Sequence, residues 1–196
     1  AYSGQSTDPS YKNLIPEVDY ELAAQFIHEH FYLVSPDSAW TPKEIESSFE
    51  YCIKSLSCEG TLTDPWNKLE HNMNGVRDDH YVSEYMNKQK RFAQKHDIYN
   101  LIVLHPKALK KNSKGEYDPV DAYDLANGAM WINKTDNFIV VHRPNQDKAP
   151  HDTTVEIQVK KIKKQKLVGV PGDWLANFNR VSNRYYDFDF SPLEPT

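Results

Sequence analysis

The chain has 196 residues, of which 39% are hydrophobic and 12% aromatic, and its formal net charge is −5. This is enough apolar material for the core of one globular domain, and it excludes disordered, collagen-like and low-complexity classes. The net negative charge excludes a basic coat over the whole surface, and no apolar run is long enough to span a membrane. We see no signal-peptide pattern and expect Cys52 and Cys58 to stay reduced, so the sequence predicts a cytoplasmic protein.

The first quarter of the chain predicts an irregular arm, two helices and a short strand. Residues 1–13 are polar and rich in turn formers, so we expect them to form the arm. From Asp19 onward apolar side chains recur at helical spacing, and this helix is expected to run into a strand over 30–34. A second helix is predicted to begin after Thr41, because a capping residue is followed by proline and by an acidic first turn. Its expected apolar face consists of Ile45, Phe49, Ile53 and Leu56.

The middle of the chain predicts a strand around 61–63, a helix over 79–96 and a strand over 98–104. The last of these is an apolar run interrupted only by Asn100, which is typical of a strand that is buried on both faces. The helix is expected to turn a set of large side chains toward the core: Tyr81, Tyr85, Met86 and Phe92.

The last part of the chain predicts more strands than helices. A lysine-rich loop over 105–119 leads to a helix over about 121–132 and a strand over 138–141. Residues 154–161 alternate between apolar and polar side chains, which is typical of a half-exposed antiparallel strand. Further strands are expected over 174–178 and 185–188. The order of elements predicts an α/β fold in one domain over 14–196, with a parallel sheet, flanking helices and antiparallel strands added at its edge.

Two polar side chains follow the predicted parallel strands at the points where those strands end. Asp64 follows the strand around 61–63, and His105 follows the strand over 98–104. Ligands of parallel α/β proteins gather at the carboxyl ends of the strands. A carboxylate there can hold Mg²⁺ through its waters, and a neighbouring polar group can sense a terminal phosphate. Each residue alone predicts little, because aspartate before proline is also a common turn former.

Two clusters of lysines stand out in this acidic chain. Local basic stripes of this kind let an acidic protein bind a polyanion. The alternative for both clusters is a solvated surface, and for the second also a charged edge strand that resists aggregation. The first cluster is Lys107, Lys110, Lys111 and Lys114, and the second is Lys160, Lys161, Lys163, Lys164 and Lys166.

Two aromatic side chains near the first lysine cluster allow two interpretations. Tyr123 and Trp131 can stack on nucleic-acid bases. A helix that packs on a sheet also needs such side chains for its core, and we favour this second interpretation.

Four stretches, in their order and spacing, resemble the RecA-type motor domain of DnaB-like replicative helicases. The resemblance is strongest to Toprim primase–helicases of the Twinkle type, including those of phages and mobile elements, and it covers residues 17–188. It implies a RecA-like parallel central sheet with flanking helices and C-terminal antiparallel strands, which is part of a P-loop NTPase core. The stretches are TDPWNKLE (63–70), YMNKQKRFAQKH (85–96), VLHP (103–106) and WINKTDNFIVVHR (131–143).

The resemblance implies roles for the residues singled out above. Asp64 would be the Walker B carboxylate beside Mg²⁺, and His105 would face the γ-phosphate. Lys161 and Lys163 would reach across a subunit interface to the γ-phosphate of the neighbouring subunit. Single-stranded DNA would be contacted by the loop over 107–114 and the segment over 126–135. The DNA-binding residues would be Lys107, Lys110, Lys111, Lys114, Asn127, Gly128 and Lys134.

The sequence departs from the pattern of this family at two places. It contains no G-x-x-x-x-G-K-[ST] phosphate-binding loop, which the family carries before the Walker B strand. Lys163 stands where the family has an arginine, and a lysine lacks the planar fork that spreads over a phosphoryl group.

The resemblance therefore implies the C-terminal part of a motor domain whose parent uses Mg²⁺ and ATP, forms a ring and translocates on single-stranded DNA. We expect the chain alone to be inactive, to bind no cofactor tightly and to make no membrane contact. One alternative is a non-catalytic RecA-like module that binds DNA or a partner protein. Another is a metal-dependent hydrolase that uses Asp64 and His105.

Overall fold

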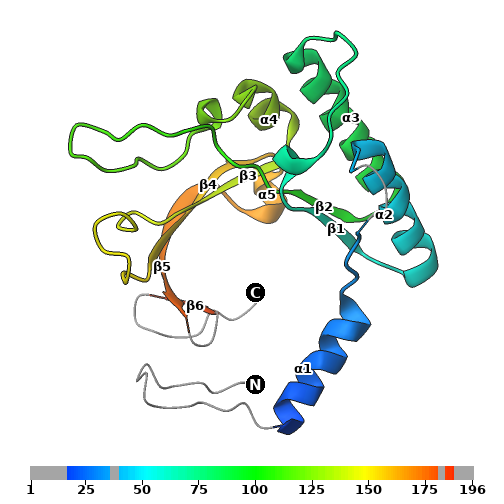
Figure 1. The fold of residues 1–196 in the computed structure, drawn as a ribbon, viewed down its shortest axis with the longest axis horizontal. Helices are drawn as coiled ribbons and strands as arrows, with labels where there is room; N and C mark the ends of the chain where they lie inside the picture. The colour runs from blue at the N-terminus through cyan, green and yellow to red at the C-terminus, as the bar shows by residue number, and fades with distance from the viewer. Residues whose placement is uncertain (1–16, 36–39, 181–183, 188–196) are drawn as a thin grey trace. The chain divides into compact units, whose positions relative to one another are not determined.

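The computed structural model describes residues 17–35, 40–180 and 184–187 (Figure 1). The arm predicted over 1–13 lies outside these residues. The elements in chain order are α1 (Glu17–His30), α2 (Pro42–Leu56), β1 (Gly60–Thr63), the 3₁₀ helix η1 (Trp66–Lys68), α3 (Asp78–His96), β2 (Tyr99–Ile102), the 3₁₀ helix η2 (Ala122–Asp124), α4 (Gly128–Lys134), β3 (Asn137–His142), β4 (Thr154–Ile162), α5 (Gln165–Val168), β5 (Gly172–Asn179) and β6 (Arg184–Tyr186).

These elements group into two compact units. The strand–helix unit consists of residues 27–108 and 122–135, and it contains β1, β2 and helices α2 to α4. The antiparallel unit consists of the described residues of 1–26, 109–121 and 136–196, and it contains β3 to β6. Within the described chain the strands thus form two sheets, one parallel and one antiparallel, and the expected single mixed sheet is not present.

In the strand–helix unit β1 and β2 pair in parallel, with Thr63 opposite Ile102 at the end of the ladder. Helix α3 contacts β2 and supplies more buried side chains than any other element of this unit. Of the side chains predicted to face inward, Tyr81 is only half-buried, and Val82 is instead fully buried. The buried side chains of α3 are Val82, Tyr85, Met86, Gln89 and Phe92.

A polar ladder runs through this core and explains why β1 carries threonine where valine or isoleucine is usual. The hydroxyl of buried Thr61 lies 3.3 Å from Asn100 Oδ1, and Asn100 Nδ2 donates to Gln89 Oε1 at 2.8 Å. Gln89 Nε2 in turn donates to Glu46 Oε2 of α2 at 3.2 Å. Buried polar groups are tolerated when each finds a partner, so this ladder joins β1, β2, α3 and α2.

The prediction that the second parallel strand is buried on both faces is wrong. Tyr99 and Leu101 of β2 are 76% and 61% exposed, and Leu62 opposite Leu101 is 54% exposed. The reason is that α3 covers one face of the two-stranded sheet, and a parallel strand is buried on both faces only when both faces are covered.

The N-terminal elements confirm one prediction and correct another. The predicted cap of α2 is confirmed: Thr41 and Glu44 form a capping box, with Pro42 in the first turn. The strand predicted over 30–34 is wrong, because residues 31–35 have no regular structure and pair with no described strand. An apolar run forms a strand only where another strand completes its hydrogen bonds.

The single helix predicted over 121–132 is also wrong, because two helices occupy this segment. Asn127, between η2 and α4, has a left-handed backbone with φ of 57°. The chain turns so tightly here that a Cβ on Gly128 would lie 1.5 Å from the carbonyl oxygen of Ala122. Only glycine fits at this approach, and the turn separates the two helices.

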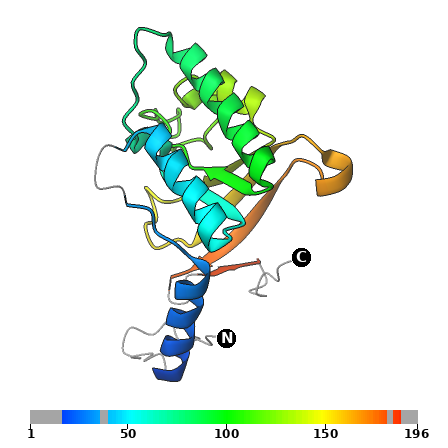
Figure 2. The same ribbon diagram turned by 90° about the vertical axis from the view of Figure 1, so that its right-hand side faces the viewer.

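In the antiparallel unit the strands lie in the order β3-β4-β5-β6, and β4 and β5 form a long hairpin that ends at α5 (Figure 2). The predicted antiparallel strand over 154–161 is present as β4. Its expected half-exposed pattern is only partly observed, because Gln158 is buried together with Val155. Because β4 is a central strand, side chains on both of its faces are covered at these positions.

Candidate functional site

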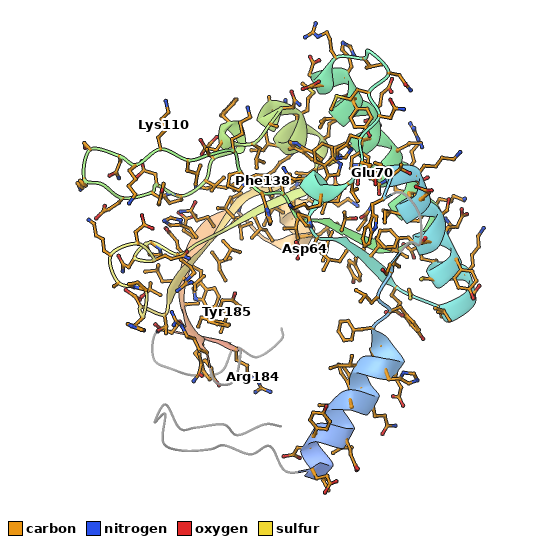
Figure 3. The ribbon with its side chains drawn as sticks, in the orientation of Figure 1. Asp64, Glu70, Lys110, Phe138, Arg184 and Tyr185 are labelled. Atoms are coloured by element: carbon orange, nitrogen blue, oxygen red, sulfur yellow. The ribbon has the colours of Figure 1, made fainter. Side chains whose placement is uncertain are left out.

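The carboxyl ends of β1 and β2 lie together at one edge of the parallel sheet. Val103 N donates to Thr63 O at 2.9 Å, and Trp66 N donates to Val103 O at 3.0 Å. The segments that follow β1 and β2 therefore stay paired just beyond the two strands. Asp64 and His105 follow these ends, and both side chains are exposed. Asp64 is labelled in Figure 3. The structure thus places the two residues expected to act on nucleotide on neighbouring loops of one unit.

Asn67 contacts this edge and was not singled out from the sequence. Its Oδ1 accepts a hydrogen bond from His105 N at 2.8 Å, and its Nδ2 donates to His105 O at 3.3 Å. The only sequence signal is its position inside the TDPWNKLE stretch, because helical or strand periodicity does not encode a contact between two loops.

The carboxylate of Asp64 makes no hydrogen bond or ion pair with the described residues. No group of three or more His, Cys, Asp or Glu side chains able to hold a metal ion occurs in this part of the chain. A metal-dependent hydrolase would need such a group. A single exposed carboxylate suits Mg²⁺ bound to a nucleotide, because this ion keeps several waters and takes other ligands from phosphates.

An aromatic cluster supports the loop that follows Asp64. Trp66 and Trp131 are 6% and 3% exposed, and their rings meet edge to face at 4.9 Å. The ring of His71 lies 4.0 Å from that of Trp66, and burial raises the pKa of nearby Tyr85. Trp131 Nε1 donates to Ala126 O at 3.0 Å. The packing interpretation of Trp131 is therefore confirmed, whereas Tyr123 is 78% exposed.

His71 has a defined tautomer in this cluster. Its Nε2 lies 3.0 Å from Trp66 O and its Nδ1 lies 3.1 Å from the Tyr81 hydroxyl. A carbonyl oxygen can only accept, so Nε2 carries the proton and Nδ1 accepts from the hydroxyl. Both ring nitrogens are thus used to hold the loop against α3.

The lysines of the first cluster differ in their surroundings. Lys111 Nζ lies 2.6 Å from Asp147 Oδ2 and 5.1 Å from the centre of the Tyr117 ring, and the hydrogen bond that it donates to Asp147 raises its pKa. Lys148 binds Glu116 at 2.6 Å, so two ion pairs join the loops of the antiparallel unit. Lys107, Lys110 and Lys114 are exposed, and Lys110 is labelled in Figure 3.

The segment over 126–135 is mainly packed against its own unit. Lys134 Nζ donates to Asn87 Oδ1 of α3 at 3.2 Å. Gly128 is buried at the close approach to Ala122, and Asn127 occupies the N-cap position of α4. These contacts give Asn127, Gly128 and Lys134 structural roles in addition to the DNA contacts expected of them.

The second lysine cluster lies at the end of β4 and beyond it. Over 160–162 β4 pairs with β3 alone, so its other edge is open within the described chain. Lys161 lies opposite Phe138, and Lys163 Nζ lies 3.3 Å from Asp136 Oδ1. The hairpin continues to an exposed tip with Leu167, which is 82% exposed. A charged edge and an inserted hairpin tip are both compatible with this geometry.

A pocket of about 330 Å³ in the antiparallel unit was not expected from the sequence. The rings of Phe178 and Tyr185 lie 5.1 Å apart in it. Arg143 donates to Asp152 O at 3.3 Å, and Arg180 donates to Pro150 O. The pocket combines aromatic faces with two guanidinium groups, and it is lined by Val141, Arg143, Val155, Phe178, Arg180 and Tyr185.

No model of a known protein family matches the sequence. The chain is 34% identical over 137 residues to the chloroplastic/mitochondrial Twinkle homolog protein of Arabidopsis thaliana. This similarity covers 69% of the chain and 19% of that protein, so the chain spans much less than the length of its relative. In the described part of the chain no helix is long and apolar enough to cross a membrane.

Two solved structures share the fold. One is an isolated ATPase domain, which superposes with a TM-score of 0.65 at 13% identity and covers 87% of this chain and 60% of that one. The other is a DnaB-like replicative helicase, solved in a study of its interactions with primase. It gives a TM-score of 0.61 at 14% identity and covers 94% of this chain and 45% of that one. The predicted α/β fold class and the resemblance to DnaB- and Twinkle-like RecA-type domains are confirmed.

Proposed function

From this DnaB- and Twinkle-like RecA-type fold, we propose that the chain is the C-terminal part of the motor domain of an ATP-dependent replicative DNA helicase. The parent, a primase–helicase of a phage or mobile element, would hydrolyse ATP with Mg²⁺ at the subunit interfaces of a hexameric ring. It would use this energy to translocate on single-stranded DNA. The observation that carries the proposal is the shared edge of β1 and β2, where Asp64 and His105 follow two paired strand ends.

At this edge each side chain has a role that its geometry permits. Asp64 would accept hydrogen bonds from the waters of a nucleotide-bound Mg²⁺, which neutralises charge on the phosphates. His105, exposed on the next loop, would contact the γ-phosphate. Lys161 and Lys163 would supply positive charge to the nucleotide of a neighbouring subunit from the end of β4.

The pocket of the antiparallel unit supports a nucleotide-binding role. Aromatic rings and guanidinium groups both stack on the faces of nucleobases. Phe178, Tyr185 and Arg143 offer these surfaces in one pocket, so this pocket would bind a nucleobase.

The exposed lysines of the first cluster support binding to single-stranded DNA. Lys107, Lys110 and Lys114 are exposed to solvent and can contact backbone phosphates. Lys111 would contribute after exchanging its partner Asp147 for a phosphate.

The proposal is tested by nucleotide turnover. This chain with Mg²⁺ and ATP should give no phosphate release above the blank, because its sequence has no phosphate-binding loop. The longer protein that carries this chain together with such a loop should hydrolyse ATP, and Asp64→Asn should abolish that activity. Robust hydrolysis by this chain alone, or full activity of the Asp64→Asn protein, would contradict the proposal.

The second candidate is a non-catalytic RecA-like module that binds DNA or a partner protein. It is favoured by the exposed lysines of the first cluster, which can contact phosphates without a bound nucleotide. It predicts that this chain binds DNA independently of Mg²⁺ and ATP. It also predicts that no longer version of the protein hydrolyses ATP.

A further inference from the structure

Asn67 continues the pairing of β1 and β2 beyond the end of the ladder. The last two backbone hydrogen bonds between the segments run from Val103 N to Thr63 O and from Trp66 N to Val103 O. Two residues further along, the backbone of His105 pairs with no backbone group of the described chain. The side-chain amide of Asn67 takes that place, because it donates to His105 O and accepts from His105 N.

The turn that carries Asn67 is firmly held. Lys68 N donates to Pro65 O at 3.1 Å and Leu69 N donates to Trp66 O at 3.0 Å, which closes η1. The indole of Trp66, beside Asn67 in the chain, is 6% exposed and packs against Trp131. Asn67 is therefore attached to a fixed support, and the side chain can transmit that fixed position to His105.

The side chain of His105 has no such support of its own. It is exposed, and it makes no side-chain hydrogen bond or ring contact with the described residues. The location of the imidazole therefore depends on the backbone of His105. This backbone is held by its two hydrogen bonds with the side-chain amide of Asn67.

We propose that Asn67 is a positioning residue that fixes the backbone of His105, and through it the place of the imidazole. This inference rests on the proposed function for its consequence in catalysis. The amide donates through Nδ2 and accepts through Oδ1 at the same time: aspartate keeps the acceptor and loses the donor, and alanine loses both. Both polar atoms of the Asn67 amide bind the backbone of His105, so its loss should impair turnover without weakening nucleotide binding.

The first test measures the position of His105 in this chain without nucleotide. Amide hydrogen exchange by NMR should show the His105 N–H exchanging about tenfold faster in Asn67→Ala, the factor expected for one lost hydrogen bond. Asn67→Asp should retain most of the protection, because it keeps the acceptor. Asn72→Ala, which removes an exposed amide of the following loop, serves as the control and should leave His105 unchanged. Equal exchange of His105 in Asn67→Ala and the wild type would overturn the proposal.

The second test measures ATP hydrolysis in the longer protein that carries a phosphate-binding loop. Asn67→Ala should lower kcat by about tenfold and leave KM for ATP within about twofold, and Asn67→Asp should recover part of the loss. Unchanged kcat in Asn67→Ala would overturn the positioning role. Absence of turnover in the wild type would contradict the proposed function, and the exchange measurement would then still decide whether Asn67 holds His105.

Discussion

Lys110 and Lys111 are neighbours in sequence, but their ammonium groups have different surroundings. Lys111 binds Asp147 and lies over the ring of Tyr117. For Lys110 the described chain contains no ion pair, and the side chain is exposed. At the residue scale, a run of lysines is thus not a uniform basic patch. A phosphate can bind Lys110 directly, whereas at Lys111 it competes with a carboxylate at 2.6 Å.

The proposed DNA interface predicts a change in salt dependence. Replacing Lys107, Lys110 and Lys111 by alanine should lower the slope of log affinity against log salt by about 1.4 to 2. Each phosphate contact on single strands contributes about 0.7, and Lys111 must first leave Asp147. The measurement is fluorescence anisotropy of a labelled single strand over a salt series. The control removes the same charge elsewhere, at the exposed lysines Lys43, Lys68 and Lys88. An unchanged slope in the first variant, or an equal change in the control, would argue against this interface.

Glu50 predicts a defined pH dependence of stability. Hydrogen bonds from Lys54 and Lys95 lower its pKa from 4.5 to about 2. A carboxyl whose pKa is lowered by folding stabilises the fold above its unfolded pKa, and this stabilisation is lost as the pH falls from 4.5 toward 2. Glu50→Gln should therefore be less stable than the wild type at about pH 6, and the difference should shrink at about pH 3.

Urea unfolding at the two pH values measures this effect of Glu50. Glu84→Gln is the matched control, since Glu84 is exposed on α3 and has no ion pair among the described residues. A constant difference between Glu50→Gln and the wild type across the two pH values would show that the lysine contacts do not stabilise the fold.

At the scale of elements, the sequence predicted those whose signals are local. The start of α2 follows from Thr41, Pro42 and Glu44, which lie within one turn. The strand over 30–34 and the continuous helix over 121–132 were wrong, because a strand needs a distant partner and the left-handed turn at Asn127 depends on packing against Ala122. Asp64 and His105 were singled out because each follows a predicted strand, and their roles stay a prediction. Asn67 was missed because its contact joins residues 38 positions apart.

The aromatic cluster predicts that Trp131 is a core residue. Trp131→Ala should lower the free energy of unfolding by about 3–5 kcal/mol, the cost of truncating a buried large aromatic side chain. Tyr123→Ala removes an exposed ring from the same region and should change it by less than about 0.5 kcal/mol. Chemical denaturation of both variants checks this, and similar losses in the two would contradict the packing role of Trp131.

The close approach between η2 and α4 predicts a strong effect at Gly128. Gly128→Ala should destabilise the fold by about 1–3 kcal/mol, because its Cβ would meet backbone atoms that cannot easily move. Gly172→Ala is the control, since a Cβ there meets nothing within 4 Å. Thermal unfolding of both proteins compares them, and equal melting temperatures would show that the turn at Asn127 relaxes without cost.

At the scale of the whole molecule, each of the two units carries its own set of candidate residues. The strand–helix unit contains Asp64, His105 and Asn67, and the antiparallel unit contains the aromatic–arginine pocket and the lysines at the end of β4. The composition alone did not reveal the pocket, because Arg143 is far in the sequence from Phe178, Arg180 and Tyr185.

The most direct measurement of the central claim is the native coding sequence upstream of residue 1. The account predicts an in-frame G-x-x-x-x-G-K-[ST] loop about 60–120 residues before Ala1, the distance expected for the strand–helix units that would precede β1. With that loop, Asp64 and His105 would complete a nucleotide site. A start codon close to Ala1, with no such loop, would contradict the helicase motor and favour the non-catalytic binding module.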